Sequence, residues 1–175
     1  MNRSVEVDVP ASSANLGVGF DVVALALDLQ LRIRVTAIDG PESSLSVEGE
    51  GRARLALDES NRFLAGFQAG WREVGDGSPP ALEVVMENEI PLGRGLGSSA
   101  AATVAGLLAA EALAGSELGS GPTLRLASEM HCGWRSGPRR KGGFHEPASL
   151  TRNRARMSQC HRRRRSQWPA KRGIG

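Results

Sequence analysis

The segment from Pro91 to Ala101, PLGRGLGSSAA, combines residue types that can hold a phosphate group. Its three alternating glycines can adopt positive φ angles and leave no Cβ that would keep a ligand away from the backbone. Ser98 or Ser99 can cap the alanine-rich helix expected over residues 100–114. Successive free N–H groups at a helix start, together with the helix dipole, attract an anion. The segment therefore predicts a phosphate-binding loop.

Other glycine-rich loops fit this segment less well. A Walker A loop needs a lysine, and residues 1–130 contain none. Gly95–Ala100 fits the dinucleotide pattern G-x-G-x-x-A, and Glu117 lies about 20 residues further on. In that pattern the first glycine follows a strand directly, whereas residues 87–91 intervene here. A loop that only lets the following helix pack closely remains the structural alternative.

The loop must be positioned by a layer of strands and helices. Alternating apolar residues predict strands over residues 5–10, 29–36, 45–47 and 82–87. Asn61 can cap a helix whose apolar face runs from Leu64 to Val74, and a short helix is expected over residues 123–130. Residues 11–21, ASSANLGVGFD, are expected to form a loop of small residues that can lead into a helix. This order favours an α+β fold over a regular βαβ array.

The charge of the chain is divided sharply between two parts. Residues 1–130 carry 9 arginines and 18 acidic residues, whereas residues 131–175 carry 13 basic residues and one acidic residue. The basic tail has almost no aliphatic residues and no hydrophobic period, so we expect it to be disordered. Charge, lysine use, cysteine use and periodicity all change at one position. Our hypothesis is that a reading-frame shift near codon 131 produced this tail.

The composition of the tail is compatible with two other functions. The run Arg162–Arg165 can attract nucleic acid non-specifically, but no recognition module accompanies it, so we expect no specific nucleic-acid partner. The pairs His131-Cys132 and Cys160-His161 lack the spacing of ordinary zinc sites. Neither a signal peptide nor an apolar stretch of 18 residues is found in the sequence. We therefore expect a cytoplasmic protein with no membrane partner.

Two motifs identify a family resemblance. Residues 91–102, PLGRGLGSSAAA, resemble the phosphate-binding motif of the GHMP small-molecule kinases. Residues 10–21, PASSANLGVGFD, are similar to the N-terminal motif of the homoserine kinases within that family. The resemblance covers residues 5–130. It implies a GHMP-kinase N-terminal domain with the ribosomal protein S5 domain 2-like fold, whose partner, the C-terminal GHMP domain, is missing.

The resemblance also implies roles for individual residues. The ATP-binding set would comprise Pro91, Leu92, Gly93, Arg94, Gly95, Leu96, Gly97, Ser98, Ser99, Ala100, Ala101 and Asn61. Asn61 would contact adenine, although a helix cap accounts for it equally well. Asn15 and Asp21 would hold the amino-acid substrate, and Ser98 and Glu129 would lie at Mg²⁺. No residue is an evident general base.

By this resemblance the ancestral activity is ATP-dependent phosphorylation of L-homoserine to O-phospho-L-homoserine, on the route to threonine. ATP and Mg²⁺ are the implied cofactors, and a homodimer is the implied assembly. A chain truncated at residue 130 is expected to turn over poorly. The alternatives are an inactive fragment and a GHMP kinase for another small molecule.

Overall fold

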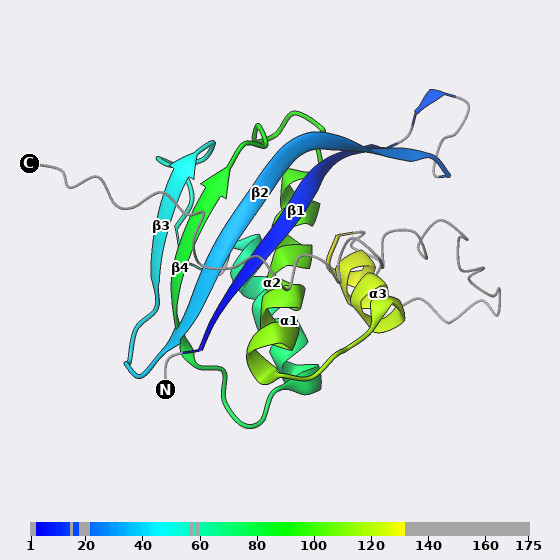
Figure 1. Cartoon of the computed structure of the whole chain (residues 1–175). Helices are drawn as coiled ribbons and strands as arrows, with labels where there is room; N and C mark the ends of the chain where they lie inside the picture. The colour runs from blue at the N-terminus through cyan, green and yellow to red at the C-terminus, as the bar shows by residue number, and fades with distance from the viewer. Residues whose placement is uncertain (1–2, 15, 18–21, 57, 59, 132–175) are drawn as a thin grey trace, which may run out of the picture. The chain divides into compact units, whose positions relative to one another are not determined.

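A four-stranded sheet and three helices make up the described part of the chain. The computed structural model describes residues 3–14, 16–17, 22–56, 58 and 60–131, so the predictions for the tail lie outside the described residues. The elements follow one another in the order of Figure 1: β1 (Ser4–Ala14), β2 (Ala24–Ile38), β3 (Ser44–Gly49), α1 (Arg62–Val74), β4 (Ala81–Asn88), α2 (Ser98–Ala114) and α3 (Ser120–His131). The expected α+β fold is confirmed.

The sheet has the strand order β1-β2-β4-β3. β2 pairs antiparallel with both β1 and β4, whereas β3 runs parallel to β4. The alternation read from the sequence places one apolar row across three strands, since Val7 lies opposite Ile33 and Ile33 opposite Met86. These three side chains are buried. The four predicted strands are therefore confirmed in the face that they bury, although β1 and β2 extend beyond their predicted bounds.

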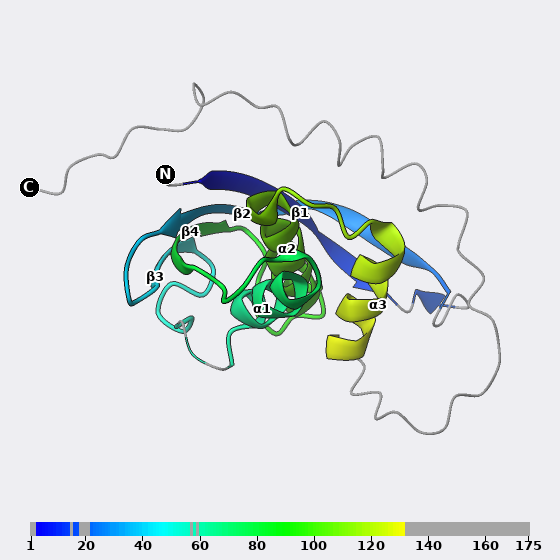
Figure 2. The same ribbon diagram turned by 90° about the horizontal axis from the view of Figure 1, so that it is seen from below.

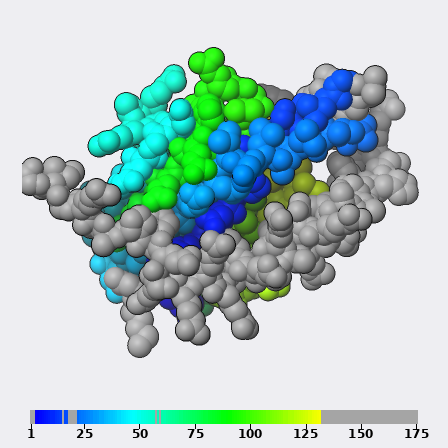
Figure 3. Space-filling view, turned by 45° about the horizontal axis from the view of Figure 1, so that its top comes forward, coloured from blue at the N-terminus to red at the C-terminus, as the bar shows by residue number. Residues whose placement is uncertain are grey.

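The opposite face of the sheet is polar and charged. Figure 3 looks onto this face, on which β3, β4 and β2 lie in that order. Arg34 on β2 lies opposite Glu6 on β1 and pairs with it at 2.8 Å. Both side chains remain partly exposed, so this ion pair contributes little to stability.

Helices α1 and α2 cover the apolar face of the sheet (Figure 2). The predicted cap of α1 is confirmed, because the Asn61 side chain accepts a hydrogen bond from the Leu64 N–H. The two helices approach closely at Gly66 and Gly106, where an added Cβ would overlap the backbone of the other helix. Glycine inside these helices therefore serves packing, which outweighs its low helix propensity.

α3 begins earlier than expected, at Ser120, and lies against α2. Glu111 of α2 accepts hydrogen bonds from the Leu118 N–H at 3.0 Å and from the Thr123 hydroxyl at 3.1 Å. None of the helices described in the structure is long and apolar enough to cross a membrane.

The prediction that β1 ends at Pro10 is wrong. The strand continues to Ala14, with an irregularity in its pairing between Pro10 and Ser12, so the first four residues of the expected loop are strand. Proline is tolerated because β1 is an edge strand, paired on one side only with β2, and a missing N–H breaks no ladder on the open side.

Candidate functional site

The glycine loop has the backbone geometry expected of it. Gly93, Gly95 and Gly97 all adopt the left-handed conformation, with φ angles of 70°, 73° and 72°. The prediction that Ser98 or Ser99 caps the helix is wrong, because Gly97 is the N-cap residue and no side chain caps α2. The serines are the first two helical residues instead.

This geometry leaves the first N–H groups of α2 free for a ligand. The first hydrogen bond from a helical N–H to the carbonyl four residues earlier runs from Ala101 to Gly97, at 2.8 Å. The preceding N–H groups in the first turn have no partner of that kind. Because no side chain occupies them, they carry the positive end of the helix dipole and can bind an anion.

Strand β1 contacts the glycine loop on one side. The Ser12 N–H donates to the Leu96 carbonyl at 3.1 Å, and Gly97 faces Ser12 so closely that an added Cβ would overlap its side chain. Position 97 thus requires glycine for two reasons, the positive φ angle and the close approach of Ser12. The structure thereby joins the two sequence motifs, since Ser12 belongs to one and Gly97 to the other.

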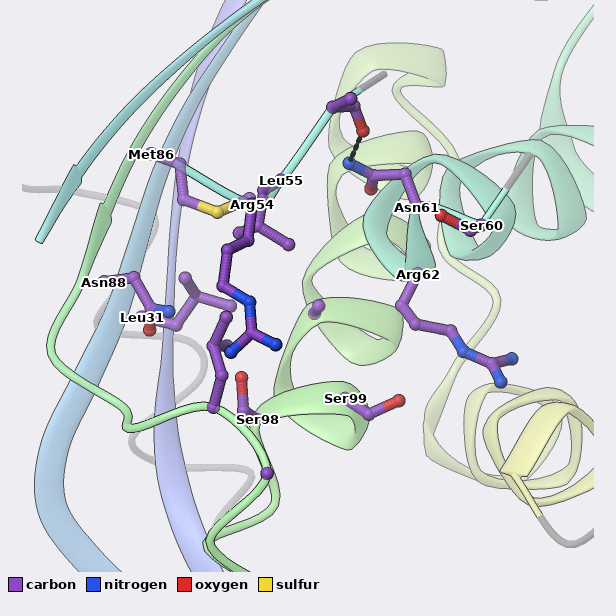
Figure 4. Close-up of a pocket in the computed structure, with 14 residues that line it drawn as sticks. Leu31, Arg54, Leu55, Ser60, Asn61, Arg62, Met86, Asn88, Ser98 and Ser99 are labelled. Atoms are coloured by element: carbon purple, nitrogen blue, oxygen red, sulfur yellow. Dashed lines mark hydrogen bonds between the residues drawn. The ribbon is translucent and has the colours of Figure 1, made fainter. Parts of the chain in front are cut away.

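A pocket of about 210 Å³ opens beside the start of α2 (Figure 4). Its apolar wall is made by Leu31, Leu55, Met86, Leu92 and Ala102, and its polar lining by Arg54, Ser60, Asn61, Arg62, Asn88, Ser98 and Ser99. Pockets that enclose whole drug-sized ligands measure about 300–1,000 Å³. The pocket can therefore hold one part of a nucleotide, with the rest outside it.

Asn61 reaches this pocket with its amide already engaged. Its oxygen caps α1, and its nitrogen donates to the Ala56 carbonyl at 2.7 Å. The side chain is almost completely buried. An adenine ring could use only the second lone pair and the second N–H of this amide. The role as helix cap is observed, and the adenine contact stays a prediction.

Asn88 and Glu89 fix the turn between β4 and the glycine loop, although they belong to neither of the two sequence motifs. Asn88 is buried, accepts from the Ile90 N–H at 3.0 Å and donates to the Glu50 carbonyl at 3.0 Å. Glu89 accepts from the Gln30 N–H at 2.9 Å, and this bond, with help from Arg32, lowers the pKa of its carboxyl. The only sequence signal was a polar residue at the end of an alternating strand.

The two residues predicted to lie at Mg²⁺ are not equally placed. Ser98 lines the pocket, but Glu129 does not, and its carboxylate pairs with Arg125 at 3.4 Å. On the same helix, the His131 imidazole lies 3.2 Å from the Ser99 hydroxyl. Residues that are two positions apart in the sequence lie about 200° apart around a helix. Glu129 and His131 therefore point in different directions. Within the described residues, no group of three or more His, Cys, Asp or Glu side chains could hold a metal ion.

Other predictions at the site cannot be placed. Asn15 and Asp21, predicted to hold the substrate, lie outside the described residues.

Asp58, just before α1, accepts hydrogen bonds from the side chain and backbone N–H of Ser60, which lower the pKa of its carboxyl. This turn holds the segment that carries Asn61 into the pocket.

The class of protein follows from this fold and loop together with a family match. Residues 61–139 match the family model described as the GHMP kinases N terminal domain. Residues 61–139 are thus similar to the N-terminal domain of the GHMP kinases, the family that the two motifs predict. The match extends beyond the expected boundary at Met130, into residues that the structure does not describe.

Curated relatives and solved structures that are similar to this chain include homoserine kinases and a mevalonate kinase. A homoserine kinase of Clavibacter michiganensis is 45% identical over 130 residues, which cover 73% of this chain and 41% of that protein. The crystal structure of a homoserine kinase from Cytophaga hutchinsonii, 31% identical, has a TM-score of 0.63 over 74% of this chain and 42% of its own. The Methanococcus jannaschii mevalonate kinase, 17% identical, shares the fold with a TM-score of 0.58 over 74% and 48%. The chain spans about two fifths of the length of the curated relatives that it matches.

Proposed function

We propose that this chain binds ATP at the glycine loop and belongs to an enzyme that transfers the γ-phosphoryl group to the hydroxyl of L-homoserine. The observation that carries the proposal is the loop itself, in which three left-handed glycines lead into a helix with free N–H groups beside a pocket. The homoserine kinases among the relatives support the choice of substrate.

The loop fits a polyphosphate sterically as well as electrostatically. Nothing lies within 4 Å of the positions where Gly93 or Gly95 would carry a Cβ, so a ligand can approach the backbone there. Phosphoryl transfer needs positioning and charge stabilisation more than covalent chemistry from the protein. ATP supplies the phosphoryl group, and the N–H groups of α2 would hold its phosphate oxygens and stabilise the charge of the transition state.

The residues present fit Mg²⁺ only in part. The Ser98 hydroxyl is a suitable oxygen ligand, and a site of this kind takes its other ligands from phosphate and water. Glu129 would have to leave Arg125 to join it. No carboxylate that could act as a general base lies among the described residues that line the pocket.

The substrate would be held by Asn15 and Asp21, as the motif implies. A carboxylate pairs with the substrate ammonium, and an amide offers both a donor and an acceptor. Ser12, in the same motif, contacts the glycine loop. This contact supports a substrate site next to the phosphates.

The test separates binding from turnover. Equilibrium binding of ADP to the chain addresses the nucleotide site, and ATP consumption with and without L-homoserine addresses the reaction. We expect ADP binding, little turnover by the chain as given, and homoserine-dependent turnover by a version whose reading frame after codon 130 is restored. Mevalonate in the same assay tests another GHMP substrate. Absence of ADP binding in both versions would refute the proposal.

A further inference from the structure

Arg54 is a pocket residue that the glycine motif does not include. It belongs to the turn after β3, where the N–H groups of Arg54 and Leu55 both donate to the Gly51 carbonyl at 2.9 Å. From this turn its side chain reaches into the pocket. Figure 4 shows its guanidinium next to the Ser98 hydroxyl, at the start of α2.

Arg54 is an exposed residue, and no described residue supplies a counter-charge to its guanidinium. Among the described residues, no side chain or carbonyl pairs with it, and no carboxylate lines the pocket. The nearby N-terminus of α2 carries the positive end of a helix dipole. Two positive groups that face each other without a counter-charge repel, and an anion between them would reverse the sign of the interaction.

The second arginine of the pocket has a different explanation. Arg62 donates to the Met130 carbonyl at 3.4 Å, in the last turn of α3. A cation at a helix C-terminus interacts favourably with the dipole there. Figure 4 shows that its guanidinium points away from Arg54, toward α3. Within the part of the chain that the structure describes, Arg62 therefore has a structural partner and Arg54 has none.

We propose that Arg54 binds phosphate oxygens of the nucleotide, so that the phosphates lie between its guanidinium and the N–H groups of α2. This inference rests on the proposed nucleotide site and adds a residue from a separate segment to it. A guanidinium suits the task because its planar fork of N–H donors matches the oxygens of a phosphate group in pairs. The β3–α1 segment would then contribute to the affinity for phosphates as well as to the pocket wall.

The experiment compares ADP with adenosine, measured by calorimetry at two salt concentrations. Arg54→Ala should weaken ADP binding by about tenfold to a hundredfold, the usual range for a charge-assisted hydrogen bond, and leave adenosine unchanged. ADP affinity should also fall less steeply with salt concentration in Arg54→Ala than in the wild type, because the variant lacks one charge pair that salt can screen. Arg54→Lys should restore part of the affinity.

Arg52→Ala is the matched control, since Arg52 is exposed in the same turn and does not line the pocket. It should leave ADP affinity within about twofold, as expected for a distant exposed charge. Thermal melts of the variants show whether each is folded. Equal ADP affinity in the wild type and Arg54→Ala would overturn the role of Arg54 while leaving the nucleotide site intact. If both ADP and adenosine weaken equally, Arg54 shapes the pocket only. No binding of either ligand by the wild type would refute the nucleotide site itself.

Discussion

Replacing Gly97 by alanine tests whether β1 and the glycine loop depend on each other. The new methyl group would meet two obstacles. The residue has a φ angle of 72°, which L-residues with a Cβ adopt only at a cost of about 1–2 kcal/mol. The methyl group would also overlap the Ser12 side chain and lie 3.1 Å from the Ser12 carbonyl oxygen.

Gly95→Ala separates the two costs. Gly95 has nearly the same φ angle, 73°, but nothing lies within 4 Å of its added Cβ. We therefore expect Gly95→Ala to lower the free energy of unfolding by about 1–2 kcal/mol. Gly97→Ala should lower it by about 2–5 kcal/mol, because overpacking adds about 1–3 kcal/mol.

Urea denaturation of the wild type and both variants measures these free energies. A third variant, Gly97→Ala with Ser12→Gly, removes the serine side chain and should recover part of the difference between the two single variants. If Gly95→Ala and Gly97→Ala destabilise the protein equally, the close contact between β1 and the loop does not matter energetically. The reasoning would then be wrong.

Four further predictions concern packing, polar networks, pH and the tail. Gly106→Ala should lower the free energy of unfolding by about 1–3 kcal/mol in a urea titration, whereas Gly121→Ala, with open space around it, should be neutral or stabilising. Asn88→Ala should lower the free energy of unfolding by about 1–3 kcal/mol in the same measurement, because it leaves buried backbone groups without a hydrogen-bond partner. Because the pKa of Glu89 is lowered in the folded protein, its carboxylate should stabilise the fold at pH values above the ordinary glutamate pKa. This stability should be lost as the pH falls through the folded pKa. In Glu89→Gln, the free energy of unfolding measured between pH 3 and 7 should lack this part of the pH dependence. Resequencing the gene should reveal a frame change near codon 131, and an uninterrupted frame would contradict that hypothesis.

The strands could be predicted because one face of the sheet is apolar and the other polar. Alternation at Val7, Ile33 and Met86 carries that information locally, residue by residue. The end of β1 could not be predicted in this way. Residues 11–14 are all small, two alanines and two serines, and they are strand because β2 extends far enough to pair with them. Strand pairing between distant segments overrode local composition there.

The site was predictable where one segment forms it and not where several segments meet. The glycine loop and its φ angles follow from a single motif. The cap at Gly97 was missed because serine is a good cap by type, whereas the close approach of Gly97 to Ser12 involves another strand. Arg54 was missed because nothing in its own turn indicates that it reaches the start of α2.

The charges of the pocket argue for an anionic ligand independently of any resemblance. Residues 1–130 contain twice as many acidic residues as arginines. If the charged residues that line the pocket were a random sample of these, most of them would be acidic. The described lining has two arginines and no acidic residue. One of the arginines is satisfied by the end of α3, and the other faces a helix start that is itself positive. Arg54 is exposed, so water and salt screen much of this repulsion in the empty protein. A negatively charged group bound between Arg54 and the start of α2 would be attracted by both positive groups.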